Sequence, residues 1–152
     1  MAKFMTKELN VTYSQANPKD EAAIVALLTA LEGDRSNFDI SKFYIAKMDD
    51  KLIGCVRIKT LTDDCLELSS LAVDRNYQGQ GVGSKLVEEL LLQETERPIF
   101  LFTESNKESF YNKFKFNTIE AIKLPTEFKK EYERLINLPF AKDLEIIAMI
   151  VK

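Results

Sequence analysis

The stretch from Leu66 to Glu94, LELSSLAVDRNYQGQGVGSKLVEELLLQE, constrains the fold more than any other part of this chain. An apolar run ends in a charged segment, and three of the chain's five glycines, Gly79, Gly81 and Gly83, then fall at alternate positions. Apolar residues repeat at helical spacing from Val82 onward. The pattern predicts a strand, a glycine turn and a helix in direct succession.

A turn of this kind suits an anion. Amides in the first turn of a helix have no carbonyl partner within the helix, and they lie at the positive end of its dipole. Glycine lets the chain bend back and lets a phosphate approach where a Cβ would intrude. The alternating glycines therefore favour a phosphate cradle over a turn that merely needs positive φ.

The nature of the phosphate ligand stays open at this point. The P-loop pattern does not match, because Ser84 stands between Gly83 and Lys85. The dinucleotide fingerprint does not match either, because the third glycine comes one residue early. Glu104 follows at about the distance of a ribose-binding acid, which keeps a nucleotide-binding oxidoreductase as an alternative.

Composition limits the chemistry. The absence of histidine excludes Ser-His-Asp and Cys-His machinery, so proton transfer falls to a carboxylate, tyrosine, cysteine, lysine or water. The net charge of -3 argues against a dedicated nucleic-acid binder, and no apolar run is long enough for a membrane span. Cys55 and Cys65 lie in strand-like runs and make a poor zinc site. We therefore expect a cytoplasmic protein with no metal, no nucleic-acid partner and no membrane segment.

The remaining pattern predicts a single domain over residues 1–152, because no repeat or linker divides it. Asn17 is expected to cap the first helix and Gly33 to close it, and Asp49-Asp50 predicts a hairpin. The expected strands are 9–15, 42–48, 51–60, 66–73, 98–103, 117–124 and 143–152. The expected helices are 17–33, 106–114, 125–137 and one after the glycines whose buried stripe is Val82, Leu86, Val87, Leu90 and Leu91.

The glycine turn resembles the acetyl-CoA signature of the GNAT superfamily of N-acetyltransferases. That signature has Arg or Gln, two residues, Gly, one residue, and Gly or Ala, which Gln78, Gly81 and Gly83 match after Leu71 and Val73 end the strand. The resemblance also covers the order of elements along nearly the whole chain.

A second segment, FTESNKESFYNKFKF, resembles the C-terminal cofactor segment of the superfamily, although Lys115 stands where the family commonly has glycine. The fold implied is of the α/β (α+β) class. It is a mixed, mostly antiparallel, twisted sheet of about seven strands flanked by helices and splayed between the fourth and fifth strands.

The resemblance implies acetyl-CoA as cosubstrate and no metal. The pantetheine arm would bond backbone groups near Leu71 and Val73, and the pyrophosphate would rest on amides of the glycine turn. The implied binding residues are Leu71, Ala72, Val73, Gln78, Gly79, Gln80, Gly81, Val82, Gly83, Ser84 and Asn106. Asn106 has a second reading as the cap of the helix that follows it.

Glu67 and Tyr111 are the candidate catalytic residues. Many family members carry a glutamate at the position of Glu67 that acts as base through water; the alternative is a surface carboxylate. Tyr111 matches the family tyrosine that protonates the departing thiolate; the alternative is a half-buried aromatic. Strand alternation puts Glu67, Ser69 and Leu71 on one face, unless a bulge shifts the phase.

These residues predict an N-acetyltransferase that moves the acetyl group directly to a primary amine of a small-molecule acceptor. The alternative is a non-catalytic acetyl-CoA sensor, and a homodimer paired through the last strand stays open. The residues expected to attract or enclose the acceptor are Asp34, Asp39, Glu127, Phe38, Tyr44 and Phe128.

Overall fold

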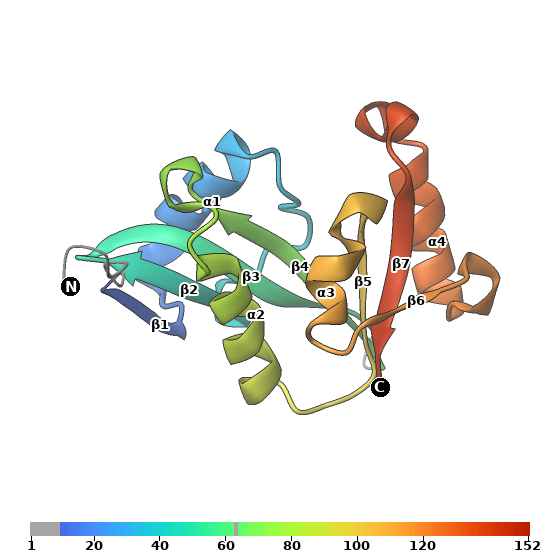
Figure 1. Ribbon diagram of the computed structural model, residues 1–152, viewed down its shortest axis with the longest axis horizontal. Helices are drawn as coiled ribbons and strands as arrows, with labels where there is room; N and C mark the ends of the chain where they lie inside the picture. The colour runs from blue at the N-terminus through green and yellow to red at the C-terminus, as the bar shows by residue number, and fades with distance from the viewer. Residues whose placement is uncertain (1–9, 63) are drawn as a thin grey trace, which may run out of the picture. The chain divides into compact units, whose positions relative to one another are not determined.

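The computed structural model describes residues 10–62 and 64–152 (Figure 1). Its strands are β1 (Val11–Gln15), β2 (Phe43–Met48), β3 (Lys51–Thr62), β4 (Cys65–Val73), β5 (Ile99–Glu104), β6 (Asn117–Ile119) and β7 (Ile146–Val151). Its helices are α1 (Glu21–Ala30), α2 (Val82–Gln93), α3 (Glu108–Asn112) and α4 (Thr126–Ile136). The predicted order of elements is confirmed. Leu9, the first residue of the first predicted strand, lies outside the described residues.

The strands form one seven-stranded sheet in the order β1-β2-β3-β4-β5-β7-β6. The pairing of β4 with β5 is parallel, whereas β1 with β2, β5 with β7 and β6 with β7 are antiparallel. The predicted fold class, a mixed and mostly antiparallel sheet with helices, is therefore confirmed. β7 lies between β5 and β6, which explains its nearly continuous apolar sequence.

The turn between β2 and β3 is the predicted hairpin. Asp49 and Asp50 have φ of 49° and 64°, so both central residues are left-handed, as a type I′ turn requires. Aspartate tolerates this conformation better than most residues do. The hairpin leads from β2 directly into β3. β3 carries two of the buried polar side chains described below, Arg57 and Lys59.

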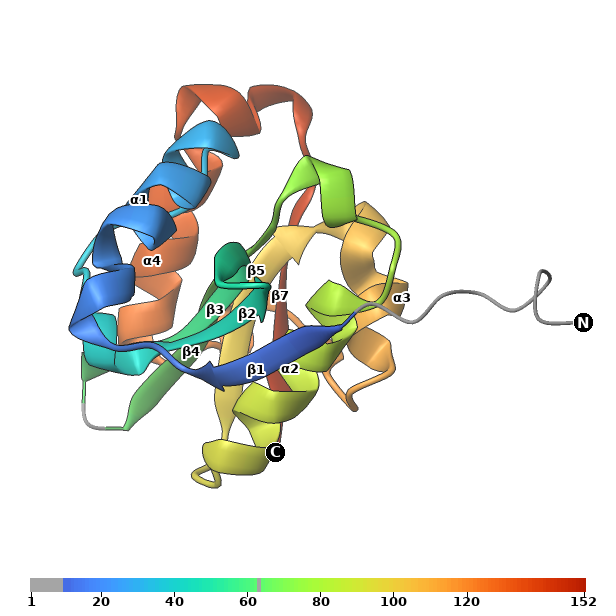
Figure 2. The same cartoon turned by 90° about the vertical axis from the view of Figure 1, so that its left-hand side faces the viewer.

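The chain divides into two compact units. The first comprises residues 10–56 and Ser70–Glu89. One of its cores joins Ile24, Leu27 and Leu28 of α1 with Cys55 of β3 and Ala72 of β4. The next residue back on β3, Gly54, faces Leu86 of α2 instead. Because neighbouring strand residues point to opposite faces, α1 and α2 cover opposite faces of this unit's sheet (Figure 2).

Both ends of the first helical segment show how side chains set its limits. The Asn17 side chain accepts from the Lys19 amide, and Asp20 accepts from the Asn17 amide, so a capping box starts a 3-10 turn before α1. At the other end the left-handed residue is Glu32, with φ of 56°, rather than Gly33. A Cβ on Gly33 would lie 2.8 Å from Leu28 Cδ2, so glycine serves close packing there.

The second unit comprises Arg57–Ser69 and Leu90–Lys152. Its core joins Cys65 of β4, Phe100 of β5 and Ala148 of β7 with Phe128 of α4 and Leu124. Within this unit, α3 and α4 lie on opposite sides of β5 and β7 (Figure 2).

The strand predicted over 117–124 ends at Ile119 instead. A 3-10 turn over Ala121–Lys123 replaces its second half, and the Leu124 amide donates to the Ala121 carbonyl. Leu124 is thereby carried into the core beside Phe128, which a continued strand would not allow. Tertiary packing outweighs the local strand pattern here.

Candidate functional site

The loop from β4 to α2 is built on backbone contacts within the first unit. The Asp74 amide donates to the Ile53 carbonyl at 2.8 Å, which fixes the end of β4, and a 3-10 turn over Arg75–Tyr77 follows. The Asp74 carboxylate accepts from the Asn76 amide and starts that turn. The Gln78 side chain donates to the Val73 carbonyl at 2.8 Å, which holds the loop against the strand it leaves.

The glycines that follow Gln78 have two different tasks. Gly79 and Gly81 have φ of 76° and 86°, a region that side-chain-bearing residues rarely adopt, and a Cβ on either would meet nothing within 4 Å. Gly83 instead lies in the first turn of α2. The predicted turn is confirmed, and the space around its left-handed glycines is open.

The helix α2 begins at the glycines. The Lys85 amide donates to the Gly81 carbonyl, which is the first hydrogen bond of the helical ladder. The amides of Gly81, Val82 and Gly83 precede that ladder and have no carbonyl within the helix to bind. Gly81 is exposed and Gly83 half-buried, whereas the Val82 side chain is buried and anchors the turn. The result is a row of amides without helical partners at the positive end of a helix of 12 residues.

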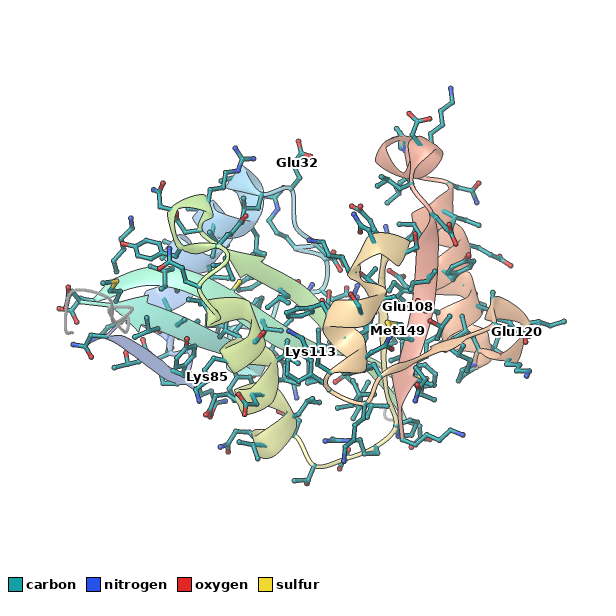
Figure 3. The ribbon with its side chains drawn as sticks, viewed as in Figure 1. Glu32, Lys85, Glu108, Lys113, Glu120 and Met149 are labelled. Carbon is teal, nitrogen blue, oxygen red and sulfur yellow. The ribbon has the colours of Figure 1, made fainter. Side chains whose placement is uncertain are left out.

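Charged side chains near this row lie in solvent. Arg75 and Lys85 are exposed, and Lys85 projects from α2 (Figure 3). Ser84 and Gln80 lie in and beside the same turn, half-buried and exposed respectively. An anion bound at this loop would therefore meet chiefly backbone amides.

The strand β4 departs from strict alternation at Ser70. Ser70 has φ of 59° inside the strand, and both Leu68 and Ser69 before it are buried. The shift in phase places Leu71 out of step with Glu67 and Ser69, so the simple alternation predicted over these three residues is wrong. A left-handed residue in a strand produces this effect, as a bulge does.

Two contacts hold the distorted residue in place. The Ser70 hydroxyl donates to the Asp34 carbonyl at 2.7 Å, and the Cys55 thiol donates to the Ser70 carbonyl at 3.4 Å. Both contacts lie within the first unit. They tie the loop after α1 to the part of β4 that carries Leu71, Ala72 and Val73.

Glu67 is buried, at 4% exposure, so it is not the surface carboxylate of the alternative reading. It belongs to the second unit, where Ser69, Arg57 and Lys59 are buried as well. Sequence reasoning missed Arg57 and Lys59. Their signal was two cations at alternate positions within the apolar run KLIGCVRIKT.

Tyr111 lies in α3 of the second unit and is 8% exposed. Its ring meets Phe110 and Phe116 edge-on, with centroids 4.9 Å and 6.0 Å away. Burial raises the pKa of Tyr111 to about 12, because the phenolate loses hydration there. The phenol therefore stays protonated through the physiological range.

Asn106 lies within a 3-10 turn over Ser105–Lys107 and is exposed. The residue at the cap position of α3 is Lys107, and its side chain makes no capping hydrogen bond. The capping role weighed for Asn106 is therefore not seen.

Most residues expected around the acceptor serve local structure. Asp34 and Asp39 accept hydrogen bonds from Ser36 and Ser41, and the Ser41 contacts lower the pKa of the Asp39 carboxyl. Phe38 packs on Phe43, and Phe128 is fully buried. Glu127 is an exposed partner of Lys130, and Tyr44 is buried on β2.

A family model described as an acetyltransferase (GNAT) domain matches residues 39–118, which is just over half of the chain. The chain belongs to the GNAT family. The matched range includes β4, the glycine loop, α2 and α3, and so covers both segments that carried the resemblance. The family expected from the glycine spacing is confirmed.

Relatives of known sequence include an amino-acid acetyltransferase from Neisseria meningitidis. It is 31% identical over 140 residues, which cover 84% of this chain and 32% of that protein. An uncharacterised N-acetyltransferase from Chlorobaculum tepidum is 28% identical over 114 residues, covering 73% of this chain and 70% of that protein. The chain spans about a third of the length of the amino-acid acetyltransferase.

Solved GNAT structures share the fold. N-acetylglutamate synthase from Neisseria gonorrhoeae, in complex with coenzyme A and N-acetyl-glutamate, superposes with a TM-score of 0.74 at 26% identity. That match covers 97% of this chain and 36% of the synthase chain. A Mycobacterium tuberculosis protein in complex with CoA gives a TM-score of 0.71 at 22% identity, covering 92% of this chain and 98% of that one.

No helix among residues 10–62 and 64–152 is both long and apolar enough to cross a membrane. Within the same residues, no three His, Cys, Asp or Glu side chains are grouped so that they could hold a metal ion. Both cysteines are free thiols and buried, as expected of small core residues.

Proposed function

We propose that the chain transfers an acetyl group from acetyl-CoA directly to a primary amine of a small-molecule acceptor. Membership of the GNAT family and the glycine loop together support this function. The observation that carries it is the row of amides at the start of α2, opened by left-handed glycines whose Cβ positions face empty space. Such a row binds a diphosphate well, and the CoA found in solved relatives contains one.

In this proposal, the amides from Gln78 to Ser84 bind the diphosphate. The backbone of Leu71, Ala72 and Val73 bonds the pantetheine arm. Asn106 contacts the pantetheine or phosphate end of the cofactor. The Gln78 contact to Val73 supports these roles, because it links the two backbone segments. Side chains at Gly79 or Gly81 would occupy the space that the ligand needs.

The reaction forms a C–N bond and breaks a C–S bond. Glu67, acting through a water molecule, takes a proton from the acceptor ammonium, and the amine nitrogen then attacks the thioester carbonyl carbon. The carbonyl oxygen gains negative charge, which a backbone amide near Leu71 stabilises. When the C–S bond breaks, Tyr111 gives its proton to the thiolate and regains one as the attacking nitrogen gives up its second proton. The raised pKa of Tyr111 supports this role by keeping the phenol protonated.

A small acceptor is favoured by the relatives, which include an amino-acid acetyltransferase and an N-acetylglutamate synthase. Cytoplasmic location and dimerisation through β7 stay predictions. The dinucleotide alternative loses its basis, because the family match accounts for the same glycines.

The test offers the purified chain acetyl-CoA with a panel of amines and measures release of free thiol. We expect turnover that depends on an amine and falls sharply in Glu67→Gln, while the exposed carboxylate variant Glu120→Gln retains it. A folded protein that binds acetyl-CoA but acetylates no amine would be a sensor rather than an enzyme.

A further inference from the structure

The turn after α3 ends the helix with a lysine in a conformation that favours glycine. The Phe116 amide donates to the Tyr111 carbonyl at 3.3 Å, and the Lys115 amide donates to the Asn112 carbonyl at 3.0 Å. These two bonds form a Schellman motif, in which Lys115 is the left-handed residue, with φ of 70°. Glycine is the usual residue at that position, because it adopts positive φ without steric cost. For the backbone alone, lysine is therefore a destabilising choice there.

The structure around Lys115 does not offset this cost. No ion pair joins Lys115 to another residue among 10–62 and 64–152. A cation near the end of a helix complements the helix dipole, but α3 has only five residues and Lys113 already lies at its C-cap. Strained residues of this kind gather at functional sites. A contact with a ligand therefore explains Lys115 better than the fold does.

Lys115 lines a groove at the edge of the sheet. The groove has a volume of about 480 Å³, which lies within the range of small-molecule sites. It is bounded by β6, the last strand of the sheet, and by the end of β7. Two strands, β5 and β7, separate β6 from β4, which carries Glu67. The groove is therefore apart from the carboxylate proposed for acetyl transfer.

Cations outnumber carboxylates in the lining of this groove. Lys115, Lys123 and Lys152 line it and are exposed, so their side chains bring three positive charges. Its one carboxylate belongs to Glu120, on the turn after β6 (Figure 3). Glu120 lies 3.6 Å from Lys123, and the two side chains are 73% and 68% exposed, so solvent screens this pair. The lining thus presents net positive charge.

The same groove also contains apolar surface. Ile119 of β6 and Ile150 of β7 line it and are half-buried. Both pack against the core around Phe128, which holds them in place. A ligand that covers these two side chains gains from the apolar area it removes from water.

We propose that this groove binds a small organic anion with an apolar body, a carboxylate or a phosphomonoester, and that Lys115 is one of its charged contacts. A cleft lined by one sign of charge concentrates ions of the opposite sign. The ammonium group of lysine is a compact charge with three donors, which suits either anionic group. Glycine in place of Lys115 would end α3 equally well but would leave the groove with one cation fewer. The site takes no part in acetyl transfer.

The first experiment titrates the chain calorimetrically with hexanoate and with phenyl phosphate, in the presence of saturating CoA so that the glycine loop is occupied. Hexan-1-ol and phenol are the neutral counterparts, whereas acetate and inorganic phosphate lack the apolar body. We expect at least one of the two anions to bind about tenfold more tightly than both of its counterparts, because charge and apolar area both contribute. If neither anion does so, the proposal is wrong.

The second experiment locates the site. Lys115→Gly should weaken binding of the better anion about fivefold, because one charged contact is lost, and should raise the midpoint of urea unfolding, because the strain is relieved. Lys123→Met leaves the turn after α3 unchanged and should weaken binding as well. Lys115→Arg keeps the charge and should bind within about twofold of the wild type. Lys142→Ala removes an exposed cation outside the groove and should change nothing.

These variants also separate a site from a general effect of charge. A Lys115→Gly protein that is more stable and binds the anion as tightly as the wild type would overturn the proposal. An equal loss of binding in Lys115→Gly and Lys142→Ala would overturn it too, because overall charge would then explain the attraction. If the chain does not bind CoA, the proposed acetyltransferase function fails. The same titrations of the free chain then decide on the groove by itself.

Discussion

The glycine loop and the buried charges of β3 and α4 are built in opposite ways. The loop is exposed, and we propose that it binds through backbone amides whose direction is set by two left-handed glycines. Arg57 and Lys59 of β3 and Glu131 of α4 are largely buried, and their charge is carried by side chains. In the loop, changes of backbone conformation should matter most, and side chains should matter only where they hold the backbone in place. Among the buried charges, changes of side chain should matter most.

The largest effect should come from Glu67, the buried carboxylate on β4. We expect Glu67→Gln to lower kcat by about 10²- to 10⁴-fold, because an amide cannot accept the proton that the amine must lose. Steady-state thiol release measures it, with CoA binding as the check on folding. A loss of less than about threefold would mean that Glu67 is not the base of the reaction.

Tyr111 should come next. Tyr111→Phe keeps the ring that packs on Phe110 and Phe116 but loses the proton donor. We expect kcat to fall about 100-fold, with little change in KM, because the phenol acts only when the thiolate departs. Phe110→Leu on the same helix serves as a packing control. An equal loss of kcat in both variants would assign Tyr111 to packing alone.

Tyr111 should also make stability depend on alkaline pH. Its pKa is raised by burial to about 12 in the folded chain, against about 10 when unfolded. Its stabilising contribution is complete below pH 10 and is lost as pH rises toward 12, because only the unfolded state releases the proton in that window. Urea unfolding at pH 9 and pH 11 should show a steeper loss in wild type than in Tyr111→Phe. Equal losses would mean that the hydroxyl is solvated.

The loop should respond to side-chain changes in proportion to their backbone contacts. Gln78→Ala releases the hydrogen bond to the Val73 carbonyl, so we expect acetyl-CoA to bind about fivefold more weakly. Gln80→Ala loses only a long contact of 3.4 Å to the Asn76 carbonyl and should change the Kd by less than twofold. If both variants bind alike, the loop does not depend on its attachment to β4.

The smallest effect is expected at Ser70, whose hydroxyl donates to the Asp34 carbonyl and whose backbone is left-handed. Ser70→Ala loses the hydroxyl contact to Asp34 and keeps the left-handed strain, whereas Ser70→Gly loses the contact and relieves the strain. Urea unfolding should therefore rank wild type above Ser70→Ala by about 1 kcal/mol, with Ser70→Gly above Ser70→Ala. The opposite order of the two variants would mean that Ser70 is not strained.

The glycine loop and the buried charges on β3 and β4 also differ in how far the sequence predicted them. The glycine turn, the start of α2 and the hairpin at Asp49-Asp50 follow from local rules. Glycine and aspartate at these positions indicate a left-handed backbone. Glu67 and Tyr111 were found through the family resemblance, and their roles stay predictions. Arg57 and Lys59 were missed, because a cation in a strand is usually exposed, whereas these two are buried.

Local rules failed where tertiary contacts decide. The second half of the predicted strand over 117–124 turns inward to bury Leu124, and the phase of β4 shifts at Ser70 because contacts to Asp34 and Cys55 hold it. Gly33 was expected to close its helix, and its amide does donate to the Leu28 carbonyl, but the left-handed residue there is Glu32, set by the neighbouring turn. Each of these outcomes depends on a residue distant along the chain or on a neighbouring turn.

The most direct test of the account is acetyl-CoA binding by Gly81→Val, compared with Gln80→Val as a matched bulky change at the next position. No atom lies within 4 Å of a Cβ built on Gly81, so the variant is strained by its φ of 86° and not by a neighbouring atom, and circular dichroism with urea unfolding can confirm that it folds. We predict that calorimetry will show at least tenfold weaker binding for Gly81→Val and near-normal binding for Gln80→Val. Equal affinity of a well-folded Gly81→Val protein and the wild type would contradict the central claim that the amides at the start of α2 bind the diphosphate.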